Sequence, residues 1–433
     1  MFVILVSLCL SGQTFCSSLD VLSLTDGLKK ALQEENLIKI KEYEEAISLF
    51  QSKVARSYLF PQIGVSYGKV FLSHEPRARN FFLGRVVEVP VSERDFHTYS
   101  ITIRQLVFDF FGTFSLYRSK KVEEDIKRIE LLRVKNSVAF QFLCHYYDLK
   151  EKEKLISVLE KEVERLESHL NDAKALYEEG VITRNEVLYT EVLLSDARQR
   201  LNTANNSKKL TVSILKKMMG KEDWEDLIFE EPKRTPLLTK SFEDYLKEAH
   251  SERPELRILS KLKDQLSYIR RAKKSEILPK FYLEGKYTYT ENRYQVHEGI
   301  TSVSFGMSVN LYDGGKTTAE LKSIDIEEKK LSVEERKLKD DIKLELERYY
   351  LDFFNAKERL EMAKNALKQA EENLRITKIR YREGVGTGTD VLDAIAALGR
   401  SEMNYYKAIY DLLRAEAGIL HATGRNLEEE YSK

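Results

Sequence analysis

The sequence contains two near-copies of one short stretch, YEEGVITRNEVL at 177–188 and YREGVGTGTDVL at 381–392. The shift from 177 to 381 is 204 positions, so Gly180 corresponds to Gly384. Long segments with the apolar periodicity of helices flank each copy, and a glycine after a helix tolerates the positive φ that ends it. The pattern therefore predicts two helical hairpins, each with a glycine turn.

The similarity between the two halves extends beyond these turns. Residues 107–124 match 311–328 at the same shift. Residues 24–38 match 241–256 at a different shift of 218, which also pairs Pro61 with Pro279. Self-similarity at fixed shifts indicates an internal duplication. We expect a first repeat at 19–237 and a second at 238–433, each with the order helix, β-hairpin, long helix, glycine turn, helix.

The helical segments differ in length within each repeat. The periodicity predicts helices over 113–179 and 183–219, with equivalents over 317–383 and 389–423. At 1.5 Å per residue the longer ones reach roughly 100 Å and the shorter ones about 55 Å. A helix over 25–60 would then stack end to end with 183–219 and match the longer helix in length.

Four segments alternate with the period of β-strands. They begin near Ile63, Tyr99, Phe281 and Val303, and each is about ten residues long, the length of a tilted transmembrane strand. A soluble sheet with one wet face is the alternative interpretation of the same pattern. The first repeat carries fourteen extra residues around 74–93, where two prolines, Gly84 and scattered charges predict an exposed loop.

The N-terminus indicates export. Residues 2–10 are apolar and are followed by small and polar residues, which is typical of a secretory signal, here 1–18. Cys16 leaves a lipoprotein as a second possibility, although the large Phe15 precedes it. No apolar run of 18 residues follows the leader, so a membrane crossing must use strands.

Composition excludes several classes of function. The chain has 70 Lys and Arg against 70 Asp and Glu, which gives no bulk attraction to nucleic acid. The seven histidines never reach a metal-ligand spacing, and GVGTGT at 384–389 lacks the ending of a phosphate loop. The sequence therefore predicts no enzyme, no metal and no cofactor.

Around the glycine turns the chain resembles the TolC family of outer-membrane efflux proteins. Besides the two turns, the resemblance includes Phe60-Pro61 and Leu278-Pro279 before strands and NLYDGG at 310–315. It implies a mainly α fold with a four-stranded β contribution. Duplicated long-helix hairpins would form a trimeric 12-helix α-barrel, continued by a 12-stranded outer-membrane β-barrel.

The resemblance also implies a function and partners. The homotrimer would sit in outer-membrane lipid, with its helical tunnel in the periplasm, as the exit duct of a tripartite efflux or type I secretion system. A periplasmic adaptor (membrane fusion protein) would connect it to an inner-membrane RND or ABC transporter, and substrates would pass through passively. The residues favour no particular substrate or type of pump. The alternative is an exported, non-conducting helical scaffold or stalk.

The family assigns its tunnel constriction to a pair of aspartate rings, with which Asp390 and Asp393 coincide. Their spacing places them on one helix face, where acids in a first turn also suit the helix dipole. By the same comparison Tyr381 and Glu186 belong to contacts that hold the tip closed. Gly386 stands where a locking arginine can occur in the family, and Arg184 and Arg382 are the possible substitutes.

The turn tips are the expected docking points for the adaptor. Glycine ends each helix, and the apolar residue after it can be presented outward. The residues concerned are Gly180, Val181, Gly384 and Val385.

Overall fold

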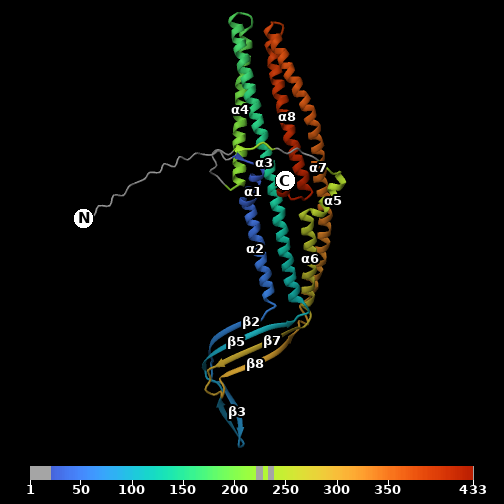
Figure 1. The fold of residues 1–433 in the computed structure, drawn as a ribbon. Coiled ribbons are helices and arrows are strands. Elements are labelled where there is room, and N and C mark those ends of the chain that lie inside the picture. Colours follow the sequence, from blue (N-terminus) through green and yellow to red (C-terminus); the bar gives the residue numbers. More distant parts are fainter. Residues whose placement is uncertain (1–20, 221–227, 233–237, 433) are drawn as a thin grey trace, which may run out of the picture. The chain divides into compact units, whose positions relative to one another are not determined.

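The protein is described by a computed structural model that covers residues 21–220, 228–232 and 238–432 (Figure 1). The expected signal peptide and Cys16 lie outside the described residues. The chain divides into two compact units. Among the described residues, the helical unit comprises 21–38, 135–220, 228–232, 238–249 and 344–432, and the sheet unit comprises 39–134 and 250–343.

Helices dominate both halves of the chain. The elements up to residue 229 are β1 (Val21–Leu22), α1 (Leu24–Glu34), α2 (Asn36–Ser57), β2 (Gln62–Phe71), β3 (Arg77–Phe82), β4 (Arg85–Pro90), β5 (Asp95–Phe108), α3 (Gly112–Glu178), α4 (Arg184–Met218) and β6 (Ile228–Phe229). Those that follow are α5 (Phe242–Glu252), α6 (Pro254–Ser275), β7 (Lys280–Thr290), β8 (Gly299–Ser308), α7 (Lys316–Arg382), α8 (Gly388–Ala422) and α9 (Leu427–Ser432).

The long helices of the two halves have equal lengths. Helices α3 and α7 each contain 67 residues, and α4 and α8 each contain 35. Their bounds keep the shift of 204 found in the sequence, from Gly112 to Lys316 and from Arg184 to Gly388. None of the helices among the described residues is both long and apolar enough to cross a bilayer.

The single helix expected over 25–60 is wrong, because the segment forms two helices, α1 and α2. Glu35 separates them with an extended backbone, ψ 121°. The second half breaks at the corresponding place, where Arg253 has ψ 122° and Pro254 begins α6. A residue before proline avoids the α region. Proline therefore accounts for the second break, whereas Asn36 stands in its place in the first half.

The sheet unit is built on one antiparallel sheet in the order β2-β5-β7-β8, which confirms the four predicted strands. The register places Val65 opposite Ile101, and Ile101 opposite Tyr287. Directly opposed residues face the same side of a sheet, so the alternation within each strand continues across all four. The sheet has two edges, β2 and β8, that no other strand of this chain covers within the described residues.

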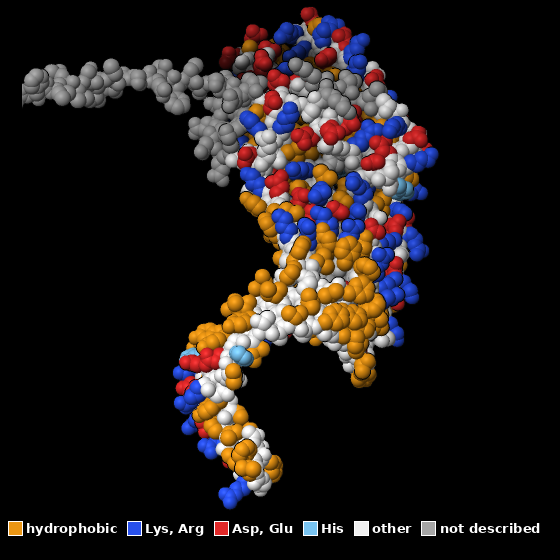
Figure 2. Space-filling model, turned by 60° about the horizontal axis from the view of Figure 1, so that its bottom comes forward, with side chains coloured by type: hydrophobic (Ala, Val, Ile, Leu, Met, Phe, Trp, Pro, Cys, Tyr) orange, Lys and Arg blue, Asp and Glu red, His pale blue; other side chains and the backbone are white. Residues whose placement is uncertain are grey.

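The two faces of this sheet differ in chemistry. Odd-numbered positions carry exposed apolar side chains, and Figure 2 shows hydrophobic side chains gathered over the strands. Gln105 interrupts this apolar face, and its amide donates hydrogen bonds to the carbonyls of Leu59 (3.1 Å) and Leu106 (2.6 Å). Even-numbered positions are mostly polar or glycine. The exposed apolar side chains include Ile63, Val65, Ile101, Ile103, Val303 and Phe305.

The exposed loop expected at 74–93 is wrong, because its centre forms the hairpin of β3 and β4. Leu83 and Gly84 have positive φ, 52° and 76°, as the favoured two-residue hairpin turn requires. Pro90 is the last residue of β4, a position that proline tolerates. The prolines therefore bound a hairpin, and the side chains near its tip are exposed.

The helical unit packs α3, α4, α7 and α8 around one apolar cluster near the glycine turns (Figure 1). All four helices contribute, for example Leu170, Leu194, Leu374 and Ile395. A second cluster joins α5 to α7 and α8. Burial of these side chains supplies most of the free energy that holds the hairpins together.

Candidate functional site

The two glycine turns close their helices in the same way. Gly180 and Gly384 have φ of 74° and 72°. The amide of Val181 bonds to the carbonyl of Leu176 (2.8 Å), and that of Gly180 to Tyr177 (2.9 Å), which is the Schellman pattern. A Cβ on either glycine would meet nothing within 4 Å, so positive φ alone accounts for glycine here.

The valine after each glycine points away from the protein. Val181 is 66% exposed and Val385 is 70% exposed. In many Schellman turns the corresponding apolar side chain packs back on its own helix. These two side chains are instead available for contact with another molecule.

The two helices that leave the turns are capped differently. Thr387 accepts a hydrogen bond from the amide of Asp390 (3.2 Å), and the Asp390 carboxylate accepts one from the amide of Thr387 (3.0 Å). This reciprocal capping box satisfies two amides that the helix leaves free. The hydrogen bond from the Thr387 amide, followed by the interaction with the Thr387 side chain, lowers the pKa of Asp390 below its usual value. Thr183, at the equivalent place, makes no side-chain cap.

Asp390 and Asp393 are both exposed at the start of α8, on one face of the helix as their spacing predicted. The residues between and after them, Val391, Leu392 and Ala394, are buried in the four-helix cluster. One side of α8 is thereby fixed to the protein, and both carboxylates lie on the opposite side. Any role at a constriction requires other copies of the chain and stays a prediction.

Tyr381 and Glu186 come together around Gly388, although they belong to different hairpins. A Cβ on Gly388 would lie 3.1 Å from Glu186 Oε2 and 3.7 Å from both Tyr381 Cε2 and His169 Nε2. Tyr381 is only 7% exposed, and within the described residues its buried hydroxyl has no hydrogen-bond partner. A side chain at 388 would press on the Glu186 carboxylate, which would have to shift slightly, whereas it would be in ordinary contact with Tyr381 and His169.

His169 is the member of this cluster that the sequence did not indicate. It is buried on α3, with its ring centroid 5.2 Å from that of Tyr381. Burial lowers its pKa, an effect that Asp172 opposes and Lys378 assists. Burial, with the nearby Glu186 and Asp172 carboxylates, raises the pKa of Tyr381. The site therefore favours a neutral imidazole and a neutral phenol.

Ion pairs join the first hairpin to the second near this cluster. Arg165 on α3 donates two hydrogen bonds to Glu402 on α8, at 3.1 and 3.0 Å. Of the two arginines considered as substitutes for a locking residue, Arg382 makes such a contact, 3.8 Å from Asp172. A two-point arginine–carboxylate pair fixes orientation as well as distance. The hairpins are thus held by polar contacts outside their shared core.

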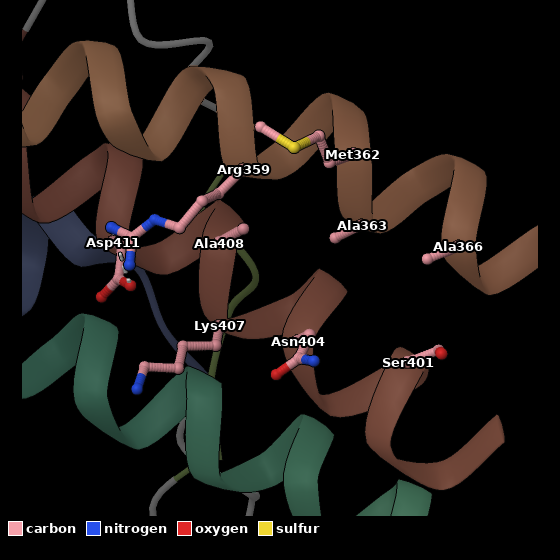
Figure 3. A pocket seen from close by; sticks show the side chains of 9 residues that line it. All are labelled: Arg359, Met362, Ala363, Ala366, Ser401, Asn404, Lys407, Ala408 and Asp411. Atoms are coloured by element: carbon pink, nitrogen blue, oxygen red, sulfur yellow. Dashed lines mark ion pairs between the residues drawn. The ribbon is translucent and has the colours of Figure 1, made fainter. Parts of the chain in front are cut away.

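A groove of about 410 Å³ lies between α7 and α8 (Figure 3). Arg359 and Asp411 form an ion pair across it at 3.7 Å. Its other lining residues are alanines, Met362, Ser401, Asn404 and Lys407, none of which forms a pair of nucleophile and base. Its small side chains suit helix packing better than a reaction. Among the described residues, no group of three or more His, Cys, Asp or Glu could hold a metal ion.

Comparison with known proteins gives consistent matches. The family model described as "Outer membrane efflux protein" matches residues 245–425. The chain is 21% identical to outer membrane efflux protein BepC of Brucella suis, over 98% of this chain and 89% of that protein. It is 23% identical to alkaline protease secretion protein AprF of Pseudomonas aeruginosa, over 93% of this chain and 84% of that protein.

The fold matches solved structures as well. The outer membrane protein VceC of Vibrio cholerae superposes with a TM-score of 0.79 at 15% identity, covering 93% of this chain and 96% of that one. At such low identity the agreement concerns the fold, and it includes nearly the whole of both chains.

Proposed function

Since this chain belongs to the outer membrane efflux protein family, we propose that it is the outer-membrane exit duct of a tripartite efflux or type I secretion system. Substrates pass through it passively from the periplasm to the exterior. The sheet lies in the outer membrane and the long helices lie in the periplasm. The observation that carries this function is the sheet with one apolar and one polar face.

The apolar face suits contact with lipid. Val65, Val303 and Phe305 are exposed on it, and water would disfavour such a continuous apolar surface. Strands β2, β7 and β8 contain 10 or 11 residues, the length of a tilted transmembrane strand. The even-numbered face, with Ser66, Ser100 and Thr102, suits a water-filled lumen.

The open edges of the sheet support assembly into a trimer. Backbone groups at a sheet edge have no partner in hydrocarbon, so only closed barrels cross a bilayer as strands. Four strands cannot close a barrel on their own. Three copies, with β8 of one beside β2 of the next, supply twelve strands, and their paired hairpins supply the twelve helices of a periplasmic tunnel.

The tips of the hairpins provide the periplasmic contacts of the duct. The exposed Val181 and Val385 dock the helical hairpins of the adaptor, which connects the duct to an inner-membrane RND or ABC transporter. Asp390 and Asp393 line the tunnel constriction as two rings of carboxylates. Tyr381 and Glu186, together with His169, hold the hairpins in the closed arrangement.

The proposal is tested by the mass and the conductance of the detergent-solubilised protein. We expect a complex of three chains that forms ion-conducting channels in planar bilayers. A stable monomer or dimer would overturn the trimer. A trimer without any conductance would favour the non-conducting stalk instead.

A further inference from the structure

The charges of the four-stranded sheet are segregated. Within these strands Lys69 and Asp95 lie on the apolar, odd-numbered side at the end far from the helices, and their side chains pair at 3.6 Å. All other Lys, Arg, Asp and Glu of the strands are even-numbered, and on β7 they run from Lys280 at the end nearer the helices to Lys286 just past the middle of the strand. These collar residues are Arg104, Lys280, Glu284 and Lys286.

One of the collar cations, Arg104, is held on the polar face by its contact with an aromatic ring. The guanidinium of Arg104 lies 4.5 Å from the ring centroid of Tyr282, an attractive cation–π distance. Gly306 makes room for that ring, because a Cβ there would lie 2.4 Å from its carbons. Glu284 is directly opposite Arg104 in the register. Glu284 is thus the one acidic residue among the four collar residues, and the other three are cations.

We propose that the collar residues make the barrel lumen electropositive and give this part of the duct a preference for anionic solutes. The inference rests on the proposed function, because the polar face becomes a lumen only in the closed barrel. Three copies would bring nine cations and three carboxylates to the lumen, spread over about 20 Å of its length from Lys280 to Lys286. Field lines concentrate in a narrow channel with low-dielectric walls, so such an excess raises the local concentration of anions.

A cysteine on the polar face reports this potential directly. Thr102 lies directly opposite Lys286, so Thr102→Cys places a thiol beside the collar. Thr98→Cys is the matched control, four residues along the same strand and face, about 14 Å away and beyond the Debye length of about 8 Å. Both are made with Cys144→Ala, which removes the one cysteine in the described part of the chain.

The readout is the rate of labelling by an anionic and by a cationic thiosulfonate of equal size. We expect the anionic-to-cationic rate ratio to be several-fold higher for the thiol at position 102 than for the thiol at position 98. Adding Arg104→Gln and Lys286→Gln should bring the two ratios together. If the thiols at positions 102 and 98 give equal labelling ratios while Arg104 and Lys286 are still charged, the proposed electropositive collar is wrong, whether or not the protein conducts.

Reversal potentials in a KCl gradient connect the collar to conduction. Neutralising Arg104, Lys280 and Lys286 to Gln should raise the cation-to-anion permeability ratio several-fold. Lys69→Gln with Arg79→Gln and Arg85→Gln removes the same charge elsewhere and should leave the ratio unchanged. If the wild type conducts but the collar variant has an unchanged permeability ratio, the collar inference is wrong and the proposed function still stands. A wild-type protein without conductance would instead refute the proposed function.

Discussion

The turn at 177–188 and the turn at 381–392 share a Schellman glycine, an exposed valine and a threonine before the next helix, yet their acidic residues are used differently. Asp390 closes a capping box with Thr387, whereas Glu186, at the equivalent position, leaves Thr183 uncapped and lies near Gly388. One copy of the motif thus uses its acid to begin a helix. The other uses it to contact the neighbouring hairpin.

The tyrosines that open the two turns show the same division. Tyr177 is 44% exposed, whereas Tyr381 is 7% exposed against His169. A duplicated backbone motif therefore keeps its geometry while its side chains acquire separate tasks. Four sets of variants test this comparison, from the largest expected effect to the smallest.

The largest effect should come from the feature that both turns share. Val181→Asp with Val385→Asp should abolish efflux, because two charges would enter an apolar docking contact, while the amount of trimer stays normal. Substrate accumulation in cells measures efflux. Val192→Asp, at a site on α4 that is 64% exposed, is the control. Normal efflux in the double variant would refute docking through the valines, and the single variants would show whether both turns dock.

The second effect separates charge from capping in the turn at 381–392. Asp390→Ala with Asp393→Ala should weaken cation selectivity and block by multivalent cations, because a ring of carboxylates attracts cations. Thr387→Ala removes the same capping box but keeps both carboxylates, so its selectivity should remain that of the wild type. Reversal potentials measure the selectivity. If Thr387→Ala changes the selectivity as much as the double aspartate variant does, the effect comes from the lost helix cap and not from the carboxylate charge.

The third effect compares the caps themselves. Thr387→Ala should cost about 1 kcal/mol, the usual value of a threonine cap, whereas Thr183→Ala should cost almost nothing. Amide hydrogen exchange in the first turn of α8 should become about fivefold faster, and that of α4 should not change. If the two substitutions accelerate amide exchange equally in α8 and α4, the conclusion that only Thr387 caps its helix is wrong.

The smallest effect concerns pH and the buried cluster at Gly388. Burial lowers the pKa of His169, so the unfolded chain binds a proton more readily than the folded one. Stability should be complete above pH about 6.5 and should fall as the pH drops below that value. The thermal midpoint of His169→Gln should depend less on pH than that of the wild type. His250→Gln, at an exposed site, should keep the wild-type dependence.

Much of the fold follows from the sequence. The apolar period and the shift of 204 locate α3, α4, α7 and α8 to within a few residues, because long helices leave a repeated local pattern. The four strands follow from alternation over ten residues. The hairpin β3–β4 does not, because its strands are short and Pro76 and Pro90 suggest a loop. The break at Glu35 carries no proline, and only comparison with Pro254 would have indicated it.

The candidate site is less accessible to sequence reasoning. The exposed valines and the two aspartates follow from their place in a turn and a first helical turn, which are local features. His169 does not, because it meets Tyr381 and Gly388 only through packing between hairpins. Nor does the capping difference, since Thr183 and Glu186 have the spacing of a capping box and do not form one.

The short parallel pair of β1 and β6 has a consequence for the order in which the chain folds. It joins Val21 to Ile228 and Leu22 to Phe229, residues far apart in sequence. By contrast, the hairpins α3–α4 and α7–α8 close across short turns, at a much smaller entropic cost. Contacts between distant residues form more slowly than local ones. We therefore expect the helical hairpins to form before the N-terminal strand pairs with β6.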